Sequence, residues 1–315
     1  MKKVKFKSKF VKIVFLASLY FFINGCNQRV SNPVQVVLPD SQRINIPPFG
    51  RDSSFDIISW NIQNYPKLND QTVSNVAEII SDLDAEIFGM QEIEDTSSFR
   101  QLLNLLPEYS GAYSTDVYSG GTYQKTAVIY RKNIVQISDM EMLFSGDSYS
   151  FPRPPLKVYV KVNYPQSSFD FTLIVLHLKA SGGSENEARR RSACEKLKNY
   201  LDAEIVVAAD KDYIVIGDWN DELNDPISQN VFQVFLNNPQ SYTFLTKELA
   251  NDPVNNATYI GGYQSVIDHI LISEDVKQEY ATGQTEVLKL DLFFSAYVYE
   301  VSDHRPVGAN FMIFQ

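Results

Sequence analysis

Polar side chains with the chemistry of an enzyme site directly follow, or directly precede, short apolar runs at five places in this 315-residue chain. Those residues are Asn61, Gln91, Glu92, His177, Asp218, Asn220, Asp303 and His304. Carboxylate and amide oxygens are ligands for hard cations, and imidazoles move protons near neutral pH. Five such places indicate one site assembled at the strand ends of a rigid scaffold.

The apolar runs themselves predict the scaffold. Expected strands are residues 55–60, 87–91, 126–131, 157–162, 169–177, 213–216, 266–272 and 307–314. Helical spacing of apolar residues predicts a helix between the first two strands, and a second helix over Ser184–Leu201 with Ser184 as its cap. Many strands are apolar on both faces, so both faces must be covered. Two sheets packed face to face with helices outside meet that need, which predicts a four-layer α/β sandwich.

The N-terminus is different from this domain. Residues 2–12 contain six lysines and no acid, residues 13–23 form an apolar run, and Cys26 follows. A basic start and a run too short to span a bilayer predict an export signal over residues 1–26. The pattern resembles the bacterial lipoprotein signal, although Ile23 and Asn24 depart from its usual residues. It implies lipidation at Cys26 and a lipid-anchored protein of the bacterial cell envelope, facing the periplasm or the surface. Ordinary secretion and an uncleaved anchor are the alternatives.

A polar, proline-rich stretch over residues 27–52 is interpreted as a flexible tether, so the globular domain is expected over residues 53–315. Removing six lysines with the signal changes the net charge from -10 to -10 - 6 = -16. Such a surface repels polyanions at long range, so nucleic-acid binding would need local cations or metal ions. Cys194, the other cysteine, lies in a helical pattern and is expected to be a core residue.

The ordered set of short motifs resembles the endonuclease/exonuclease/phosphatase superfamily, which includes enzymes of the pancreatic deoxyribonuclease type. The matching segments are residues 59–62, 91–92, 177–178, 217–220, 267–268 and 302–304. They occur in the family's order and span the predicted domain. The family fold is also a two-sheet sandwich, in agreement with the hydrophobic pattern. The resemblance implies a phosphoesterase, and no protein partner is indicated.

Cleavage of a phosphodiester needs an activated water, a proton for the leaving group and neutralisation of charge on the phosphate oxygens. Mg²⁺, with Mn²⁺ as an alternative, supplies that neutralisation and prefers oxygen ligands. Glu92 is the leading ligand, Asn61 beside it is assigned to the same metal site, and Asp303 is a second candidate ligand.

The two histidines of the motif set are expected to handle protons and phosphate oxygens. His304 is the expected general base, and the family pattern assigns Asp268 to hold its other nitrogen. His177 is either the acid or a donor to a phosphate oxygen. Asp218 and Asn220 are expected to position the nucleophile and bind phosphoryl oxygens.

One neighbourhood departs from the deoxyribonuclease branch, where a glutamate orients the histidine that matches His177. Residues 123–125 read Tyr-Gln-Lys here, and a glutamine cannot stabilise an imidazolium as a carboxylate does. Lys125 is either a contact for the substrate phosphate or an exposed lysine. The cationic segment 179–191, with Lys179 and Arg190, either binds phosphate or has its arginines, residues 189–191, paired with acids of the same helix.

The third histidine, His269, is not included in the predicted site. It neighbours Asp268 on a predicted strand, so its side chain should point to the opposite face. We expect it to serve packing or to lie on the surface.

Fold and catalytic set define the reaction class, not the substrate. The leading hypothesis is an exported DNase-type endonuclease acting on nucleic acid. A sphingomyelinase-like phospholipase is second; residues 290–299 are its only candidate for membrane contact, and they are expected to contain a buried strand. A phosphatase of inositol or sugar phosphates is third. An alternative from a different functional class is a surface-binding lipoprotein that retains the fold and has lost catalytic activity.

Overall fold

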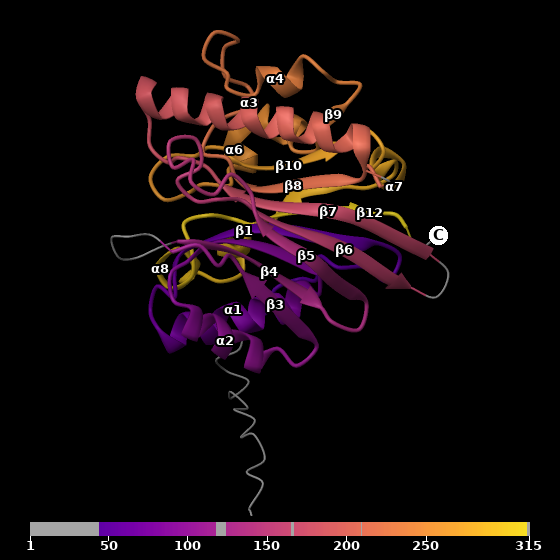
Figure 1. Cartoon of the computed structure of the whole chain (residues 1–315). Helices are drawn as coiled ribbons and strands as arrows, with labels where there is room; N and C mark the ends of the chain where they lie inside the picture. The colour runs from indigo at the N-terminus through magenta and orange to yellow at the C-terminus, as the bar shows by residue number, and fades with distance from the viewer. Residues whose placement is uncertain (1–43, 118–123, 165–166, 209, 314–315) are drawn as a thin grey trace, which may run out of the picture. The chain divides into compact units, whose positions relative to one another are not determined.

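The computed structural model of the chain describes residues 44–117, 124–164, 167–208 and 210–313, which form two six-stranded sheets (Figure 1). The first sheet has the order β11-β12-β1-β2-β4-β3, with β1 (Phe55–Tyr65), β2 (Ile87–Ile93), β3 (Tyr109–Tyr113), β4 (Lys125–Arg131), β11 (Thr285–Val287) and β12 (Val307–Phe311). The second has the order β5-β6-β7-β8-β10-β9, with β5 (Val135–Met142), β6 (Leu156–Tyr164), β7 (Ser167–His177), β8 (Tyr213–Asp218), β9 (Tyr242–Phe244) and β10 (Asp268–Ser273).

Helices cover the outer face of each sheet, which gives four layers (Figure 1). On the first sheet lie α1 (Asp70–Leu83) and α2 (Thr96–Leu105), and on the second lies the long α3 (Ser184–Val207). Shorter helical turns complete the chain: α4 (Gln233–Leu236), α5 (Lys247–Ala250), α6 (Pro253–Asn256), α7 (Lys277–Tyr280), η2 (Leu290–Leu292) and α8 (Tyr297–Glu300). The predicted four-layer α/β sandwich is confirmed.

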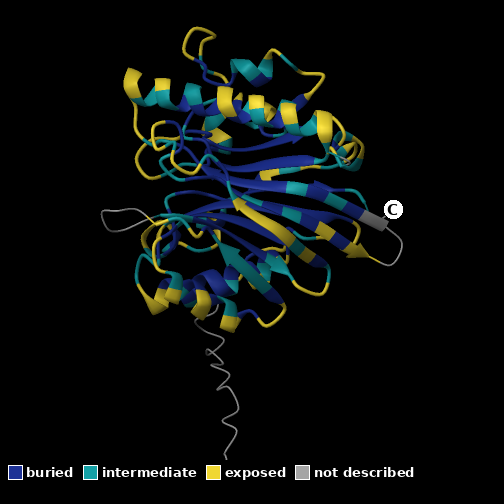
Figure 2. Cartoon of the chain, in the orientation of Figure 1, coloured by how far each residue is buried: buried dark blue, intermediate teal, exposed yellow. Residues whose placement is uncertain are grey.

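Three apolar layers hold these four layers together, and Figure 2 shows the sheets buried between more exposed helices. Strand β1 shows why its sequence is apolar on both faces. Ile58 and Trp60 face α1 and α2, whereas Phe55 and Ile57 alternate with them and face the second sheet. Cys194 on α3 is fully buried in the third layer, as expected of a core cysteine.

Strand direction brings the chemically interesting ends to one edge. β1 runs parallel to β2, and β7 runs parallel to β8, so the carboxyl ends of each pair lie together. β10 runs antiparallel to β8 and begins with Asp268 opposite Asp218. β12 runs antiparallel to β1, which places the segment before it beside the end of β1. The carboxyl ends of the two parallel pairs, the start of β10 and the segment before β12 therefore lie at the same end of the sandwich.

The N-terminal part of the domain begins earlier than predicted. Ile44, Ile46 and Phe49 are buried in the core beneath the first sheet, and the backbone amides of Ile44 and Ile46 donate to Glu78 and Asp82 of α1 at 2.7 and 3.0 Å. Residues 44–52 are thus part of the packed domain and not of a tether. Residues 1–43, with the predicted signal and Cys26, lie outside the described residues. Among those described, no helix is long and apolar enough to cross a membrane.

The segment 290–299 does not contain the predicted buried strand. It forms η2 and α8, joined by a short turn. Four of its large apolar side chains are exposed: Leu292 (70%), Phe293 (55%), Val298 (38%) and Tyr299 (69%). The expectation was wrong because side chains spaced for a helical turn were interpreted as an alternating strand.

Ser184 was expected to cap the helix that begins there, but it does not. The N-cap of α3 is Gly183, and no side chain caps this end of the helix.

A buried glutamate makes the stability of the fold depend on pH. Glu86, directly before β2, accepts a hydrogen bond from the Asp56 amide at 2.8 Å, and burial with the nearby Asp56 carboxylate raises its pKa from 4.5 to about 8. Between these values the folded chain holds a proton that the unfolded chain has released, so stability falls as pH rises. We expect Glu86→Gln to stabilise the protein by about 1–3 kcal/mol at pH 8 and by much less at pH 5.

Thermal melting of wild type and variant at the two pH values checks this expectation. The amide oxygen of glutamine keeps an acceptor for the Asp56 amide, so only the ionisation is removed. An equal change of melting temperature at pH 5 and pH 8 would show that Glu86 does not carry the pH dependence.

Candidate active site

A polar pocket of about 360 Å³ opens where the strand ends meet. It is lined by Gln63, Asn64, Glu92, Gln124, His177, Ala180, Ser181, Asp218, Asn220, Tyr259, Tyr263, Ile267, Asp303 and His304. Six of the predicted site residues are in this set, contributed by the ends of β2, β7 and β8 and the segments that follow β8 and precede β12. Residues as far apart in sequence as Gln63 and His304 therefore share one pocket.

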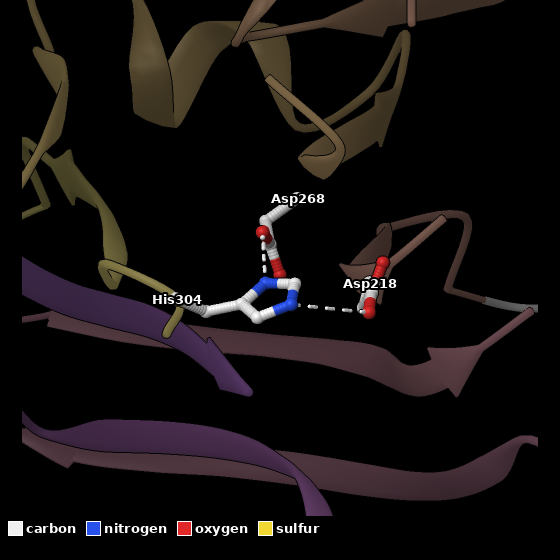
Figure 3. A group of neighbouring side chains, drawn as sticks. All are labelled: Asp218, Asp268 and His304. Carbon is white, nitrogen blue, oxygen red and sulfur yellow. Dashed lines mark hydrogen bonds and ion pairs between the residues drawn. The ribbon is translucent and has the colours of Figure 1, made fainter. Parts of the chain in front are cut away.

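The centre of the site is a histidine between two buried carboxylates (Figure 3). Nδ1 of His304 lies 2.8 Å from Oδ2 of Asp268, and Nε2 lies 3.9 Å from Oδ2 of Asp218. Burial of the ring lowers the pKa of His304, but Asp268, Asp218 and Asp303 outweigh burial and raise it to about 10. The Asp268 contact leaves Nε2 as the nitrogen that faces the pocket.

Both tryptophans of the chain support this arrangement from behind. Trp60 donates to the Tyr297 hydroxyl at 2.9 Å, and that hydroxyl donates to the carbonyl of His304. Trp219 donates to the carbonyl of His269, next to Asp268, at 3.1 Å. Buried indole and phenol groups need such partners, so their packing also fixes the backbone around the histidine–aspartate pair.

His177, at the end of β7, is buried and close to two carboxylates. Its Nε2 lies 3.4 Å from Oδ2 of Asp218 and 3.8 Å from Oε1 of Glu92. Burial, together with the charges of Arg153, His304 and Lys179, lowers the pKa of His177 well below its ordinary value. A neutral imidazole can still donate one N–H, so the geometry fits a donor to a phosphate oxygen better than a cationic acid.

The missing glutamate of the deoxyribonuclease branch has a structural consequence. Nδ1 of His177 is buried and has no hydrogen-bond partner among the described residues. Gln124 lines the same pocket, but its amide oxygen accepts from Nε and Nη2 of Arg153 at 3.1 and 2.6 Å. Gln124 therefore does not orient His177.

Asp218 lies between the two histidines and is fully buried. Oδ2 accepts from the Asn61 side chain at 2.9 Å, and Oδ1 accepts from the Asn220 amide at 2.9 Å. Burial and the Asp268 carboxylate raise the pKa of Asp218 to about 7. Asn220 lines the pocket, and its side-chain nitrogen lies 3.3 Å from the carbonyl of Leu178.

Glu92 reaches the pocket because β2 is irregular at this point. The register of β2 against β4 shifts between Met90 and Ile93, and Glu92 has φ of 65°, in the left-handed region that is unfavourable for a side chain. The irregularity turns Glu92 toward His177, and the Asn64 amide holds its Oε2 at 2.8 Å. Strained backbone of this kind is common where a functional side chain must be aimed.

Asn61 and Asp303 complete the acidic side of the pocket. Asn61 donates to Glu92 at 3.1 Å and to Asp218, while its own oxygen accepts from the Gln63 amide at 3.0 Å. Asn61 thus orients two carboxylates and does not itself line the pocket. The Asp303 side chain accepts from the Gln63 side chain at 2.9 Å and lines the pocket directly.

The donor set fits a divalent cation. Glu92, Asp218, Asp268 and Asp303 converge, and burial, with like charges, raises the pKa of both Asp218 and Asp303. Carboxylates crowded in this way repel one another unless a cation lies among them. Asp218, Asp268 and His304 also each offer a ligand atom within 4.8 Å of the other two. However, Asp268 is already hydrogen-bonded to Nδ1 of His304, so this group is not the preferred metal site. Asp218 also lines the pocket but lies beside both imidazoles, so we regard Glu92 and Asp303 as the ligands.

The predicted phosphate-binding cations behave differently from expectation. Lys125 donates to the carbonyl of Asp116 at 2.6 Å and does not line the pocket. Lys179 donates to the carbonyl of Ala180 at 2.8 Å, at the pocket rim. Arg190 is 5% exposed; its Nε binds Asp221 at 2.7 Å, and Nη1 donates to the carbonyls of Lys179 and Ser181, each at 2.9 Å. Arg190 is therefore a structural residue that holds the loop after β7, not a phosphate ligand.

Replacing Arg190 with Met is expected to cost about 3–5 kcal/mol of stability, because Asp221 would stay buried without its partner. The matched control is Arg189→Met, since Arg189 on the same helix makes exposed hydrogen bonds to the carbonyls of Ser148 and Tyr149 and has no ion pair with a carboxylate among the described residues. Denaturant melts should separate the two variants clearly. Equal stabilities of the two variants, with a raised KM for Arg190→Met alone, would instead restore the phosphate-binding interpretation.

Several residues that line or support the pocket were missed from the sequence. Arg153 donates to Gln124 and, at 3.0 Å, to the carbonyl of Leu178. Gln63 binds Asp303, and Tyr259 and Tyr263 form one wall. None of them stands at the end of an apolar run, which was the signal that identified the others.

His269 is a packing residue, as expected. It is buried and hydrogen-bonded to the Thr246 hydroxyl and to the carbonyl of Asp221.

The fold and the pocket together define a phosphoesterase of the two-sheet α/β-sandwich class. The chain belongs to the Endonuclease/Exonuclease/phosphatase family, whose pattern it matches over residues 58–304. Members of this family are hydrolases of phosphate esters and are generally dependent on divalent metal ions. No curated protein matches the chain by sequence.

Solved structures share the fold at low sequence identity. An endonuclease/exonuclease/phosphatase family protein from Bacteroides thetaiotaomicron is 18% identical, with TM-score 0.60 over 82% of this chain and 97% of its own. A mannosyl-6-phosphatase from the same organism is 17% identical, with TM-score 0.58 over 81% and 98%. D. rerio TDP2, complexed with a single-strand DNA product, is 16% identical, with TM-score 0.56 over 82% and 99%.

Proposed function

We propose that this protein is a Mg²⁺- or Mn²⁺-dependent phosphodiesterase, an exported DNase-type endonuclease held at the bacterial envelope by lipidated Cys26. The observation that carries the proposal is the convergence of His304, Asp268, His177, Asp218 and Glu92 at one pocket, with the interatomic distances given above between 2.8 and 3.9 Å. A binding module has no need for two imidazoles aimed at one cluster of carboxylates.

The residues divide the reaction as follows. His304 takes a proton at Nε2 from the attacking water, because Asp268 holds Nδ1 at 2.8 Å. Neutral His177 donates its N–H to a phosphate oxygen, and Asp218 between the imidazoles orients the water. The water oxygen bonds to phosphorus while the P–O bond to the leaving group breaks, and the leaving oxygen takes its proton from solvent water at the pocket mouth. When bound by Glu92 and Asp303, a divalent cation supplies positive charge that neutralises the phosphate oxygens and offsets the carboxylates holding the proton on His304.

Three observations favour nucleic acid as the substrate. A diester presents one negative charge at the reacting phosphate, which suits a pocket lined by the three carboxylates of Glu92, Asp218 and Asp303. Arg153 and Lys179 lie next to His177 and offer local positive charge on a chain of net charge -10. The fold is also that of TDP2, which has been solved with a DNA product.

A phospholipase is the second candidate, favoured by the exposure of Leu292, Phe293, Val298 and Tyr299. Lys67 donates to the carbonyl of Val298 and also to the Gln63 side chain, which binds Asp303. An apolar surface connected in this way to the pocket would suit a lipid substrate in a bilayer.

A substrate panel tests the proposal: plasmid DNA, RNA, sphingomyelin vesicles and inositol phosphates, each with Mg²⁺ and with EDTA. We expect nicking of DNA that EDTA abolishes. Faster cleavage of sphingomyelin, lost in a Phe293→Ser variant that still nicks DNA, would favour the phospholipase. A purified protein that cleaves no phosphate ester with either metal would support the inactive surface-binding alternative.

A further inference from the structure

Two tyrosines form an aromatic side of an otherwise polar pocket. Tyr259 and Tyr263 line it together with the catalytic candidates, and Ile267 is the other large apolar side chain of its described lining. The ring centroids of Tyr259 and Tyr263 lie 5.0 Å apart, with the planes inclined at 59°. The Tyr259 ring also lies 5.2 Å from the His304 ring. Tyr259 is therefore in direct contact with the proposed general base, and Tyr263 packs against Tyr259.

The backbone fixes Tyr259 in this position. Tyr259 pairs with Ser265 on one side and with His304 on the other, and the Ile260 amide donates to the carbonyl of Asp303 at 2.8 Å. The turn from Tyr259 to Ser265 is thus attached to the same two residues that act at the phosphate. Motion of the turn relative to the pocket is restricted by these bonds.

Glycine at the tip of the turn permits this close approach. A Cβ at Gly261 would lie 2.6 Å from Oδ2 of Asp303 and 2.8 Å from the Tyr259 hydroxyl, closer than any real contact. The turn therefore passes directly over the Asp303 carboxylate. Tyr263 follows and is 66% exposed, so most of its ring is accessible from the pocket mouth.

We propose that Tyr259 and Tyr263 form a stacking wall for a planar aromatic group, a nucleobase, on the phosphate ester that reacts at His304. This inference rests on the proposed function and specifies which part of the substrate the pocket recognises. An exposed tyrosine ring offers an apolar face at small entropic cost, and stacking on such a face tolerates every base. It also provides attraction that does not depend on charge, which an acidic protein needs for a polyanion.

The test compares two esters with the same leaving group: thymidine 5′-p-nitrophenyl phosphate and methyl p-nitrophenyl phosphate, each with Mg²⁺. The wall predicts that Tyr263→Ala lowers the ratio of their kcat/KM values by about 5- to 100-fold, because only the thymidine ester carries a base. Tyr263→Phe should keep the ratio within about 3-fold of wild type, since the ring face is retained. Tyr164→Ala, at the far end of β6, is the matched control and should leave the ratio unchanged.

An equal fall for both esters in Tyr263→Ala would overturn the stacking wall. Loss of the ratio in Tyr263→Phe would do so as well, because it would assign the effect to the hydroxyl. Failure of wild type to hydrolyse either ester would refute the proposed function. Calorimetric binding of thymidine monophosphate and of methyl phosphate would then test whether the stacking wall binds a base. Weaker binding of the nucleotide alone in Tyr263→Ala would support the wall, and no difference from wild type would refute it.

Discussion

Replacing His304 with Ala is expected to lower kcat/KM for hydrolysis of bis-p-nitrophenyl phosphate by about 10³-fold. The variant loses the nitrogen that takes the water proton, and it leaves the buried Asp268 without its partner at 2.8 Å. Steady-state kinetics at saturating Mg²⁺ measure the effect. Circular dichroism at the assay temperature establishes that the variant is folded.

The Asp268→Asn variant keeps the His304 imidazole and changes only the group that holds its Nδ1. The amide keeps a polar group beside Nδ1 but removes the negative charge, so we expect a smaller fall of about 10- to 100-fold. His304→Ala with activity within 5-fold of wild type would assign the base to another residue. The most direct substitute would then be Asp218, which lies between both imidazoles.

The Glu92→Gln variant is expected to bind Mn²⁺ at least about 10-fold more weakly than wild type and to need correspondingly more Mg²⁺ for half-maximal activity. Glutamine keeps the size of the side chain and one oxygen, but it removes the charge that a hard cation prefers. Calorimetric titration of the EDTA-treated full chain measures binding without reference to activity.

Glu94→Gln is the matched control for Glu92→Gln. Glu94 lies two residues further along the same segment and is exposed, and the substitution makes the same change of charge. Because Glu94 does not line the pocket, its variant should bind Mn²⁺ within about 2-fold of wild type. Equal weakening in both variants would mean that only overall charge near the pocket matters.

The general architecture was predictable because strands covered on both faces leave a distinctive sequence. Residues 55–60 place apolar side chains in two cores, Ile58 and Trp60 in one and Phe55 and Ile57 in the other, and two sheets with helices outside are the simplest packing that buries both sets. Site residues at strand ends were predictable for a related reason. An apolar run that stops at Asn61, His177 or Asp218 marks the edge of the sheet, and the parallel pairs bring those edges together.

Other parts of the site depended on tertiary contacts that leave no local pattern. Arg190 stands in a polar stretch of sequence and Arg153 stands between prolines, and neither context reveals that Arg190 is buried against Asp221 or that Arg153 donates to Gln124. The aromatic wall at Tyr259 depends on how a Gly-Gly turn packs over Asp303, which spacing alone does not reveal. Segment 290–299 was misjudged because a short apolar run fits a helical turn as well as a strand.

The central claim is that the His304 pocket hydrolyses a phosphate diester and requires a divalent metal ion to do so. The most direct test titrates Mn²⁺ into the EDTA-treated full chain and follows, in the same samples, Mn²⁺ binding and hydrolysis of bis-p-nitrophenyl phosphate. We predict no hydrolysis before Mn²⁺ is added, and a rate that rises with the same half-saturation as binding. Full activity of the metal-free protein, or no hydrolysis when Mn²⁺ is saturating, would contradict the proposed enzyme.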